Sequence, residues 1–335
     1  MQRTLIIGDI HGCYDELLQL LDVAAVTSDD IVVSVGDLVD RGPQPGEVVR
    51  WFRARRGAVV LMGNHERKHV RKTFSYSQEV TRLQLGESYS ADVEWMRGLP
   101  YYYETPAIRV VHAAMMPGVP LAEQAEDVLA GTVSGETKLR AAIPDAWWHE
   151  RYTDDVPIAF GHHVVPEPLL RDGKIYGLDT GACHGGRLTA LSVPDFTLHS
   201  VPARADHWAA TARAYQVPVL RQRAWPTLSW RKIHEVIGDR EGAAGPDTTA
   251  YLAALTAWVA AVHGLIPAVF AAIPAIAERV GSAGFEAHPA KPLLYLHARN
   301  RLALADVESR CPTPAATLAL ATKLGIATAE IPAPP

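Results

Sequence analysis

The chain has 335 residues, enough for one large domain or two ordinary ones with a substantial hydrophobic core. Hydrophobic residues make up 48% and charged residues 21% of it, which excludes a disordered chain and a multi-span membrane protein. The net charge of −5 excludes a chain-wide basic field for nucleic acid, and three cysteines are too few for a disulfide framework.

Short apolar runs and amphipathic segments alternate at the start of the chain. The runs Thr4–Gly8, Ile31–Gly36 and Ala58–Gly63 predict buried strands. Between them, Tyr14–Val26 and Pro45–Arg55 carry apolar residues at helical spacing. This order predicts a βαβαβ unit with right-handed crossovers.

The middle of the chain continues with strand signals. Residues 73–99 are predicted to be helical, and residues 122–148 to mix helix and loop. Five further strands are expected, at Ile108–His112, Ile158–Gly161, Lys174–Leu178, Arg187–Val193 and Phe196–Val201.

After residue 203 the chain becomes rich in Ala and Leu at helical spacing. We therefore predict two domains, residues 1–203 and an α-helical extension of residues 204–335 that acts as a cap, as an oligomer interface or as simple packing. A charged linker is expected at Gly238–Asp247. The expected helices are Leu228–Ile237, Thr248–His263, Ile266–Val280, Leu293–Ser309 and Ala315–Leu324.

One stretch of the extension is long enough to cross a membrane. Residues 250–277 contain no Asp, Glu, Lys or Arg, but Pro267, Pro274 and the many alanines favour buried helices of a soluble domain. At the N-terminus, Asp9 interrupts the first apolar run before a signal peptide could form. We expect cytoplasmic residence and no membrane partner.

Polar clusters follow the predicted strands of the first domain. In an open α/β sheet, the loops at the carboxyl ends of adjacent strands meet in one crevice. The residues expected to gather there are Asp9, His11, Asp37, Asp40, Arg41, Asn64, His65, His112 and His162.

Carboxylate and imidazole donors suit two divalent transition ions, because the set is too rich in nitrogen for calcium and lacks the thiolates of a structural zinc site. One carboxylate can bridge ions about 3.5–4 Å apart, which activate a shared water and clamp the oxygens of an in-line displacement. Arg41 adds a fork-shaped cation for phosphate oxygens. The cluster therefore predicts phosphoester hydrolysis.

The ordered motifs resemble the calcineurin-like metallophosphoesterases, and within them the phosphoprotein phosphatase branch. They are Gly8–Gly12, Gly36–Gly42, Gly63–Glu66, His112 and Gly161-His162, and the resemblance covers residues 3–201. That branch includes Ser/Thr protein phosphatases and symmetrical diadenosine tetraphosphatases. The resemblance implies an α/β (α+β layered) fold: a β-sandwich flanked by helices, with residues 1–203 as the dimetal catalytic domain.

The resemblance also implies roles for the clustered residues. Arg41 would clamp phosphate, and His65 would protonate the leaving oxygen while Asp40 orients its imidazole. Asp37 would bridge the metals. Of the remaining ligands, Asp9 and His11 would hold one metal, and Asn64, His112 and His162 the other.

Three features lie outside that pattern. His163 stands where the family commonly has threonine, and its role as a ligand or a substrate contact stays open. No motif places a second phosphate-binding arginine, and Arg151 is a candidate. The basic residues 67–72 are interpreted as a solvated helix face that could attract polyanions if it lies near a phosphate site.

The expected function is metal-dependent phosphoester hydrolysis, foremost as a phosphomonoesterase or protein Ser/Thr phosphatase that uses a hydroxide bridging two divalent ions. Manganese is expected first, with iron or zinc as alternatives. The alternative function is that of a bis(5'-nucleosyl)-tetraphosphatase, and a further one is a non-catalytic module that binds phosphorylated ligands. The Gly63–Glu66 motif favours the phosphatase, whereas the ending Asp179–Leu191 favours the tetraphosphatase. The expected partners are a phosphorylated protein or a nucleotide, without nucleic acid, and a second copy bound through the helical extension.

Overall fold

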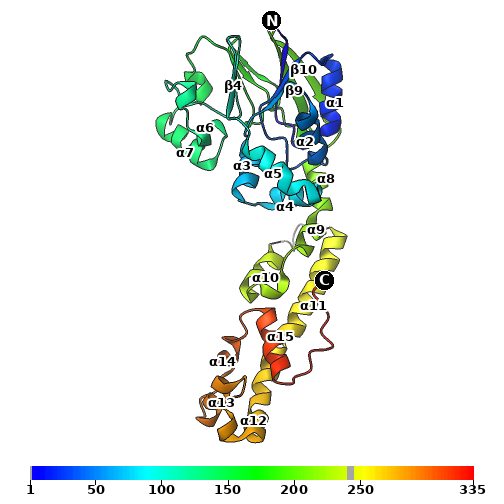
Figure 1. The fold of residues 1–335 in the computed structure, drawn as a ribbon, viewed down its shortest axis with the longest axis vertical. Coiled ribbons are helices and arrows are strands. Elements are labelled where there is room, and N and C mark those ends of the chain that lie inside the picture. The colour runs from blue at the N-terminus through cyan, green and yellow to red at the C-terminus, as the bar shows by residue number, and fades with distance from the viewer. Residues whose placement is uncertain (1, 240–244) are drawn as a thin grey trace. The chain divides into compact units, whose positions relative to one another are not determined.

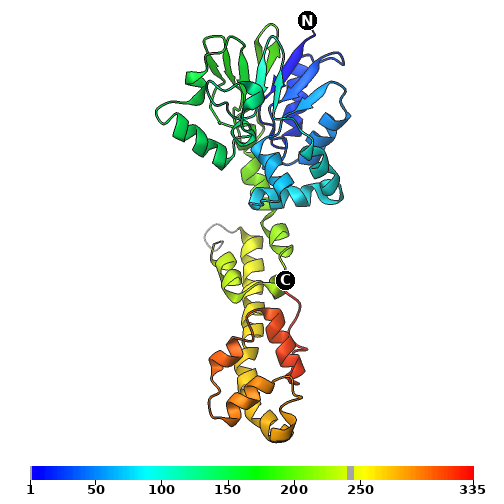
Figure 2. The same ribbon diagram turned by 60° about the vertical axis from the view of Figure 1, so that its left-hand side comes forward.

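The computed structural model describes residues 2–239 and 245–335, which form two compact units, Met1–Tyr215 and Gln216–Pro335 (Figures 1 and 2). The division follows Tyr215 rather than residue 203 because helix α8 (His207–Ala214) packs within the first unit. There the imidazole Nε2 of His207 lies 2.8 Å from the carboxylate of Glu16. The predicted linker Gly238–Asp247 falls partly outside the described residues.

The first sheet of the first unit has the strand order β10-β9-β1-β2-β3. Strands β1, β2 and β3 are parallel, and helices α1 (Tyr14–Val23) and α2 (Pro45–Ala54) connect them, which confirms the predicted βαβαβ unit. Strand β9 pairs antiparallel with both β1 and β10. The strands are β1 (Thr4–Ile7), β2 (Ile31–Ser34), β3 (Ala58–Val60), β9 (Arg187–Val193) and β10 (Thr197–Pro202).

The second sheet has the strand order β4-β5-β6-β8-β7. Its strands are β4 (Tyr102–Glu104), β5 (Arg109–Val111), β6 (Ile158–Phe160), β7 (Leu169–Arg171) and β8 (Ile175–Gly177). The sequence did not predict β4 and β7. Both are three-residue edge strands that are largely exposed, so they lack the apolar run that marks a buried strand.

The two sheets pack face to face over one buried core. Ile6 and Val33 of the first sheet share this core with Val110 and Ala159 of the second. Helices α1 and α2 cover the other face of the first sheet, where Leu17 packs into a separate core cluster. The fold is thus the expected sandwich of two sheets flanked by helices.

Three more helices follow β3, and two precede β6. They are α3 (Asn64–Arg71), α4 (Tyr76–Leu85), α5 (Tyr89–Arg97), α6 (Glu126–Leu129) and α7 (Val133–Ala142). Helix α3 starts at the first residue after Gly63, so the carboxyl end of β3 leads directly into it.

The second unit is helical. Its helices are α9 (Gln216–Arg221), α10 (Trp230–Gly238), α11 (Pro246–His263), α12 (Leu265–Gly284), α13 (Lys291–Ala298), α14 (Leu304–Glu308) and α15 (Pro314–Lys323). The prediction of a single helix over Leu293–Ser309 is wrong. The chain breaks between α13 and α14, where Asn300 adopts a left-handed backbone with φ of 50°.

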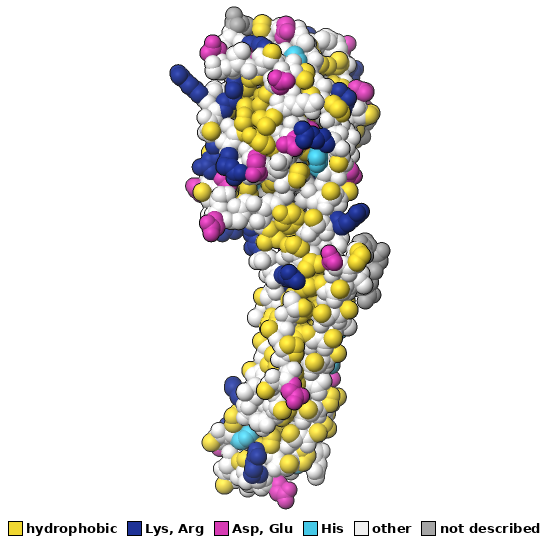
Figure 3. Space-filling model, turned by 90° about the vertical axis from the view of Figure 1, so that its right-hand side faces the viewer, with side chains coloured by type: hydrophobic (Ala, Val, Ile, Leu, Met, Phe, Trp, Pro, Cys, Tyr) yellow, Lys and Arg dark blue, Asp and Glu magenta, His cyan; other side chains and the backbone are white. Residues whose placement is uncertain are grey.

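Helices α11 and α12 form a continuous apolar stretch, Pro246–Gly284, that is long enough to cross a membrane by length and composition. One stripe of it is fully buried in the unit: Leu255, Val262, Val269 and Ile273. Alanines occupy much of the exposed side. Figure 3 accordingly shows hydrophobic side chains over much of the visible face of this unit.

Candidate metal centre

The predicted site residues gather at the carboxyl ends of five strands, β1, β2, β3, β5 and β6. The carboxylate of Asp37, which follows β2, lies at the middle of the group and is almost fully buried. Its oxygens lie 3.6 Å from Nε2 of His11, 3.6 Å from Nε2 of His112 and 3.8 Å from Nε2 of His65. Asp37 is therefore placed to face two groups of donors at once.

His11 lies on one side of Asp37, and the buried carboxylate of Asp9 lies near that of Asp37. The Nδ1 atom of His11 lies 2.8 Å from the carbonyl oxygen of Val39, so the Nε2 atom is left to face Asp37. The carboxylate of Asp9 accepts the backbone N–H of His162 at 3.1 Å, which ties the loop after β1 to the loop after β6.

Asn64, His112 and His162 form the other side. The Oδ1 atom of Asn64 lies 3.1 Å from Nε2 of His112 and 3.1 Å from Nδ1 of His162. The second nitrogen of His112 lies 3.1 Å from the carbonyl oxygen of Val35, and that of His162 lies 3.3 Å from the carboxylate of Glu136. One nitrogen of each ring is thus held by the fold, and the other faces the shared centre.

His65 and Asp40 form a hydrogen-bonded pair beside the centre. The Nδ1 atom of His65 lies 2.5 Å from Oδ2 of Asp40, while His69 Nε2 lies 2.9 Å from Oδ1 and the Gln78 amide donates to the same carboxylate. Burial alone would raise the pKa of Asp40, but the hydrogen bonds from His65 and His69 hold that pKa well below its usual range. Asp40 is therefore an anion that fixes the imidazole of His65.

Arg41 directs its guanidinium toward the centre, with Nη1 3.1 Å from Nε2 of His11. It is partly exposed, unlike Asp40 before it. The charge of this side chain is thus available to an anion that binds over the cluster.

The backbone is strained at these residues. Ten described residues other than glycine have positive φ, and five of them belong to this cluster: His11 (46°), Asp37 (52°), Asp40 (69°), Arg41 (67°) and His162 (69°). Such conformations cost free energy and concentrate at functional sites. Gly63 and Gly161 permit the tight packing, since a Cβ at either position would collide with the carboxylate of Asp37 or Asp9.

Sequence reasoning missed Glu66 as a supporting residue. Its buried carboxylate accepts the backbone N–H groups of Leu38 at 2.7 Å, Asp37 at 2.9 Å and Gly63 at 3.2 Å. It thereby joins the loops after β2 and β3. Glu66 was visible within the Gly63–Glu66 motif, but its partners are distant in the sequence.

The charges of the cluster fit divalent cations. Burial, together with the neighbouring Asp179 and Asp37 carboxylates, raises the pKa of Asp9 well above its usual value. Burial and the nearby His112 lower the pKa of His162 to about 4, so its imidazole is neutral and can act as a ligand. Converging carboxylates and neutral imidazoles are the donors that two transition ions need.

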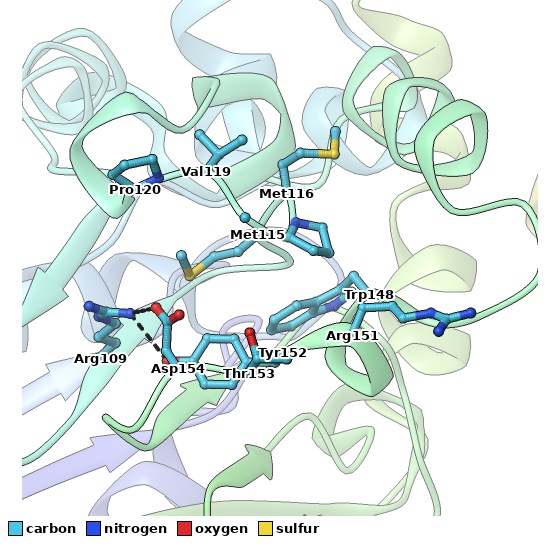
Figure 4. Close-up of a pocket in the computed structure, with 12 residues that line it drawn as sticks. Arg109, Met115, Met116, Val119, Pro120, Trp148, Arg151, Tyr152, Thr153 and Asp154 are labelled. Atoms are coloured by element: carbon cyan, nitrogen blue, oxygen red, sulfur yellow. Dashed lines mark hydrogen bonds and ion pairs between the residues drawn. The ribbon is translucent and has the colours of Figure 1, made fainter.

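His163 and Arg151, the two further residues that the sequence raised as possible ligand or phosphate contacts, lie at the edge of this cluster or beyond it. The ring of His163 lies 4.8 Å from that of His162 and meets Trp147 edge-on at 5.2 Å. Arg151 borders a separate cavity of about 340 Å³ and points away from Arg109 and its partners (Figure 4). Its guanidinium pairs with Asp145 at 3.4 Å, so the structure gives no support to Arg151 as a phosphate ligand.

Known proteins resemble the first unit. A bis(5'-nucleosyl)-tetraphosphatase of Halalkalibacterium halodurans, the asymmetrical PrpE, is 30% identical over 230 residues, which cover 59% of this chain and 93% of the relative. A symmetrical bis(5'-nucleosyl)-tetraphosphatase of Methylobacillus flagellatus is 27% identical and covers 59% of this chain and 95% of its own.

A crystal structure provisionally assigned as a diadenosine tetraphosphatase superposes with a TM-score of 0.51 at 28% identity, covering 60% of this chain and 94% of that one. The family model of the calcineurin-like phosphoesterases matches residues 2–198, most of the first unit. The chain belongs to the calcineurin-like phosphoesterases and is a hydrolase of phosphoric esters.

Proposed function

We propose that the protein hydrolyses bis(5'-nucleosyl) tetraphosphates such as diadenosine tetraphosphate. The observation that carries this proposal is the convergence of two donor groups on Asp37 in a chain whose relatives are named as tetraphosphatases of both the symmetrical and asymmetrical kind. These relatives are matched over more than nine-tenths of their own length.

The proposed metal ligands form two sets that share Asp37. Asp9 and His11 would hold one divalent ion, and Asn64, His112 and His162 the other. When bound, such a pair lowers the pKa of a shared water and stabilises charge on the phosphoryl oxygens. We propose manganese for both positions.

The remaining roles belong to side chains that do not bind metal. Arg41 would hold phosphate oxygens through its forked N–H groups. His65 would donate the proton on Nε2 to the leaving oxygen, because its Nδ1 is held by Asp40 at 2.5 Å and its Nε2 faces Asp37. The carboxylate of Asp40 would hold this imidazole in place for the step.

A protein Ser/Thr phosphatase was the foremost expectation from the sequence, mainly because of the Gly63–Glu66 motif. The relatives give more support to the tetraphosphatase alternative. In this structure the buried carboxylate of Glu66 accepts backbone N–H groups of the loops after β2 and β3, so the residue has a structural role that does not depend on the substrate.

The test is a side-by-side assay of manganese-loaded protein on diadenosine tetraphosphate, a phosphoserine peptide and an aryl phosphate, with Asp37→Asn as the inactive control. We expect the dinucleotide to have the highest kcat/KM, whereas preference for the peptide would overturn the proposal. The products identify the type of cleavage: two molecules of ADP show symmetrical cleavage, and ATP with AMP shows asymmetrical cleavage. Inactivity on all three substrates with metal bound would favour a binding module.

A further inference from the structure

Helix α3 carries a row of cations that begins at the metal centre. Asn64, Lys68 and Arg71 are four and three residues apart, a spacing that places them on one face of the helix. At 1.5 Å per residue, Lys68 lies about 6 Å and Arg71 about 10 Å along the axis from Asn64. Arg67 lies next to Lys68. We call Arg67, Lys68 and Arg71 the basic track.

The basic track lines a hollow that reaches the proposed metal ligands. This hollow has a volume of about 230 Å³, with Asn64 and the three cations on one wall and Gly131–Val133 on the other. A Cβ at Gly131 would collide with the imidazole of His162, so the second wall also touches a proposed ligand. A molecule in the hollow would therefore adjoin the metal centre.

Lys68 and Arg71 of the track are available to an external anion, whereas the side chain of Arg67 hydrogen-bonds with Tyr101. Lys68 and Arg71 form no ion pair with any described residue. Lys68 is half-buried, and the Nε atom of Arg67 is buried without a hydrogen-bond partner among the described residues. By contrast, Lys138 of α7 pairs with Asp127 at 2.8 Å, and Arg97 of α5 pairs with Glu94 at 3.2 Å.

Interaction with the C-terminal end of the α3 dipole accounts for some positive charge in its last turn. It does not account for the placement of Lys68 and Arg71 on the face that bears Asn64, or for the hollow beside them. A row about 10 Å long exceeds the reach of one phosphate at the centre. A chain of phosphates could contact the centre and the track together.

We propose that the basic track holds the phosphates of a polyphosphate substrate that are not being cleaved. The inference rests on the proposed function and deepens it, because it assigns the tetraphosphate a direction: from Asn64 along α3 toward Arg71. A phosphomonoester would use only the metal centre and Arg41. The track would thus contribute to the preference for a dinucleotide over an aryl phosphate.

The test compares Lys68→Ala/Arg71→Ala with Lys72→Ala, which removes a cation from the same segment but outside the hollow. We expect the double variant to raise KM for diadenosine tetraphosphate about tenfold or more, with a much smaller loss on aryl phosphate, as for two lost charge contacts. Lys72→Ala should behave as the unmodified protein. Equal losses on both substrates, or equal KM values in all three proteins, would overturn the proposal.

A second arm does not depend on cleavage of the dinucleotide. Inorganic tripolyphosphate is tested as a competitive inhibitor of aryl phosphate hydrolysis, with the free metal concentration held constant. We expect the double variant to need about tenfold more inhibitor than Lys72→Ala. If the protein fails to cleave dinucleotides but this shift is found, the proposed function fails and the track stands. If the dinucleotide is cleaved and the inhibition constants are equal, the function stands and the track fails.

Discussion

The two units differ in what they bury. The first unit encloses ionisable side chains, among them Asp9, Asp37, Asp40, Glu66 and His112, each less than 5% exposed. Among the described residues of the second unit, the buried polar groups are uncharged, such as the hydroxyls of Thr248 and Thr317 and the indole N–H of Trp225. Burying charge is unfavourable unless partners or metals compensate. The buried ionisable groups of the first unit therefore lower its stability and are expected to serve a function. The interior of the second unit is mainly apolar, and its burial stabilises the fold.

The largest effect is expected from loss of the metals. Chelation should reduce hydrolysis to background, and added manganese should restore it, because two ions supply the activated water and the charge stabilisation. Asp37→Asn should be as inactive and should bind less manganese, since it weakens the ligand between both groups. The measurements are turnover and metal content per chain. Unchanged turnover in chelator would contradict the dimetal account.

A smaller and selective effect is expected at His65. His65→Ala should lower kcat for a poor leaving group by about 10²–10⁴-fold, the usual range for a general acid. An aryl phosphate should lose much less, because its leaving group needs little protonation. Comparing kcat on a phosphoserine peptide, whose leaving group is an alkoxide, with kcat on an aryl phosphate checks this. Losses of equal size would argue against the role of His65 as an acid.

A substitution in the second unit should separate stability from chemistry. Leu293 is fully buried in the apolar core of that unit, so Leu293→Ala should lower the free energy of unfolding of this unit by about 2–5 kcal/mol. Because the proposed catalytic residues all belong to the first unit, kcat should stay unchanged where the variant is folded. Denaturant unfolding and steady-state kinetics measure the two effects. A marked fall in kcat without unfolding would show that the two units are not functionally separate.

The smallest effect concerns the acid stability of the first unit. Burial alone would raise the pKa of Glu16, but the N–H of Arg204 and the imidazole of His207 lower it overall. A carboxyl whose pKa falls on folding stabilises the protein above its unfolded pKa, and that stability is lost as the pH decreases through the folded value. Glu16→Gln should therefore lower the free energy of unfolding by about 1 kcal/mol at neutral pH and by less near pH 3.

Thermal unfolding at several pH values measures this difference. The matched control is Glu235→Gln in helix α10 of the second unit, where the carboxylate pairs with Arg231 and Lys232 at the surface. The control should change little. If Glu16→Gln has the same effect at every pH, its contribution is packing rather than charge.

The parallel strands β1–β3 and the polar residues that follow them could be predicted because local patterns determine both. An apolar run that ends at Gly-Asp or Gly-Asn is visible without a structure, and parallel strands bring such ends together. The partners that hold these residues in place could not be predicted in the same way. Gln78 and His69 reach Asp40 from helices α4 and α3, contacts that depend on tertiary packing alone.

In the helical unit, too, the sequence pattern predicted some elements correctly and missed a feature that depends on the backbone. The apolar periodicity predicted α11 and α12 correctly. The same periodicity predicted one helix where the structure has two, α13 and α14. The left-handed conformation of Asn300 breaks the chain there, and periodicity carries no information about a single backbone angle. The exposed alanines of α11 and α12 likewise give no sign of function.

The most direct test of the account is anomalous diffraction from crystals of the full chain grown with manganese. The account predicts two peaks at the strand ends of the first unit, one beside His11 and Asp9 and one beside Asn64, His112 and His162, with the carboxylate of Asp37 between them. A single peak, or peaks away from Asp37, would contradict the shared dimetal centre on which the proposed hydrolysis depends.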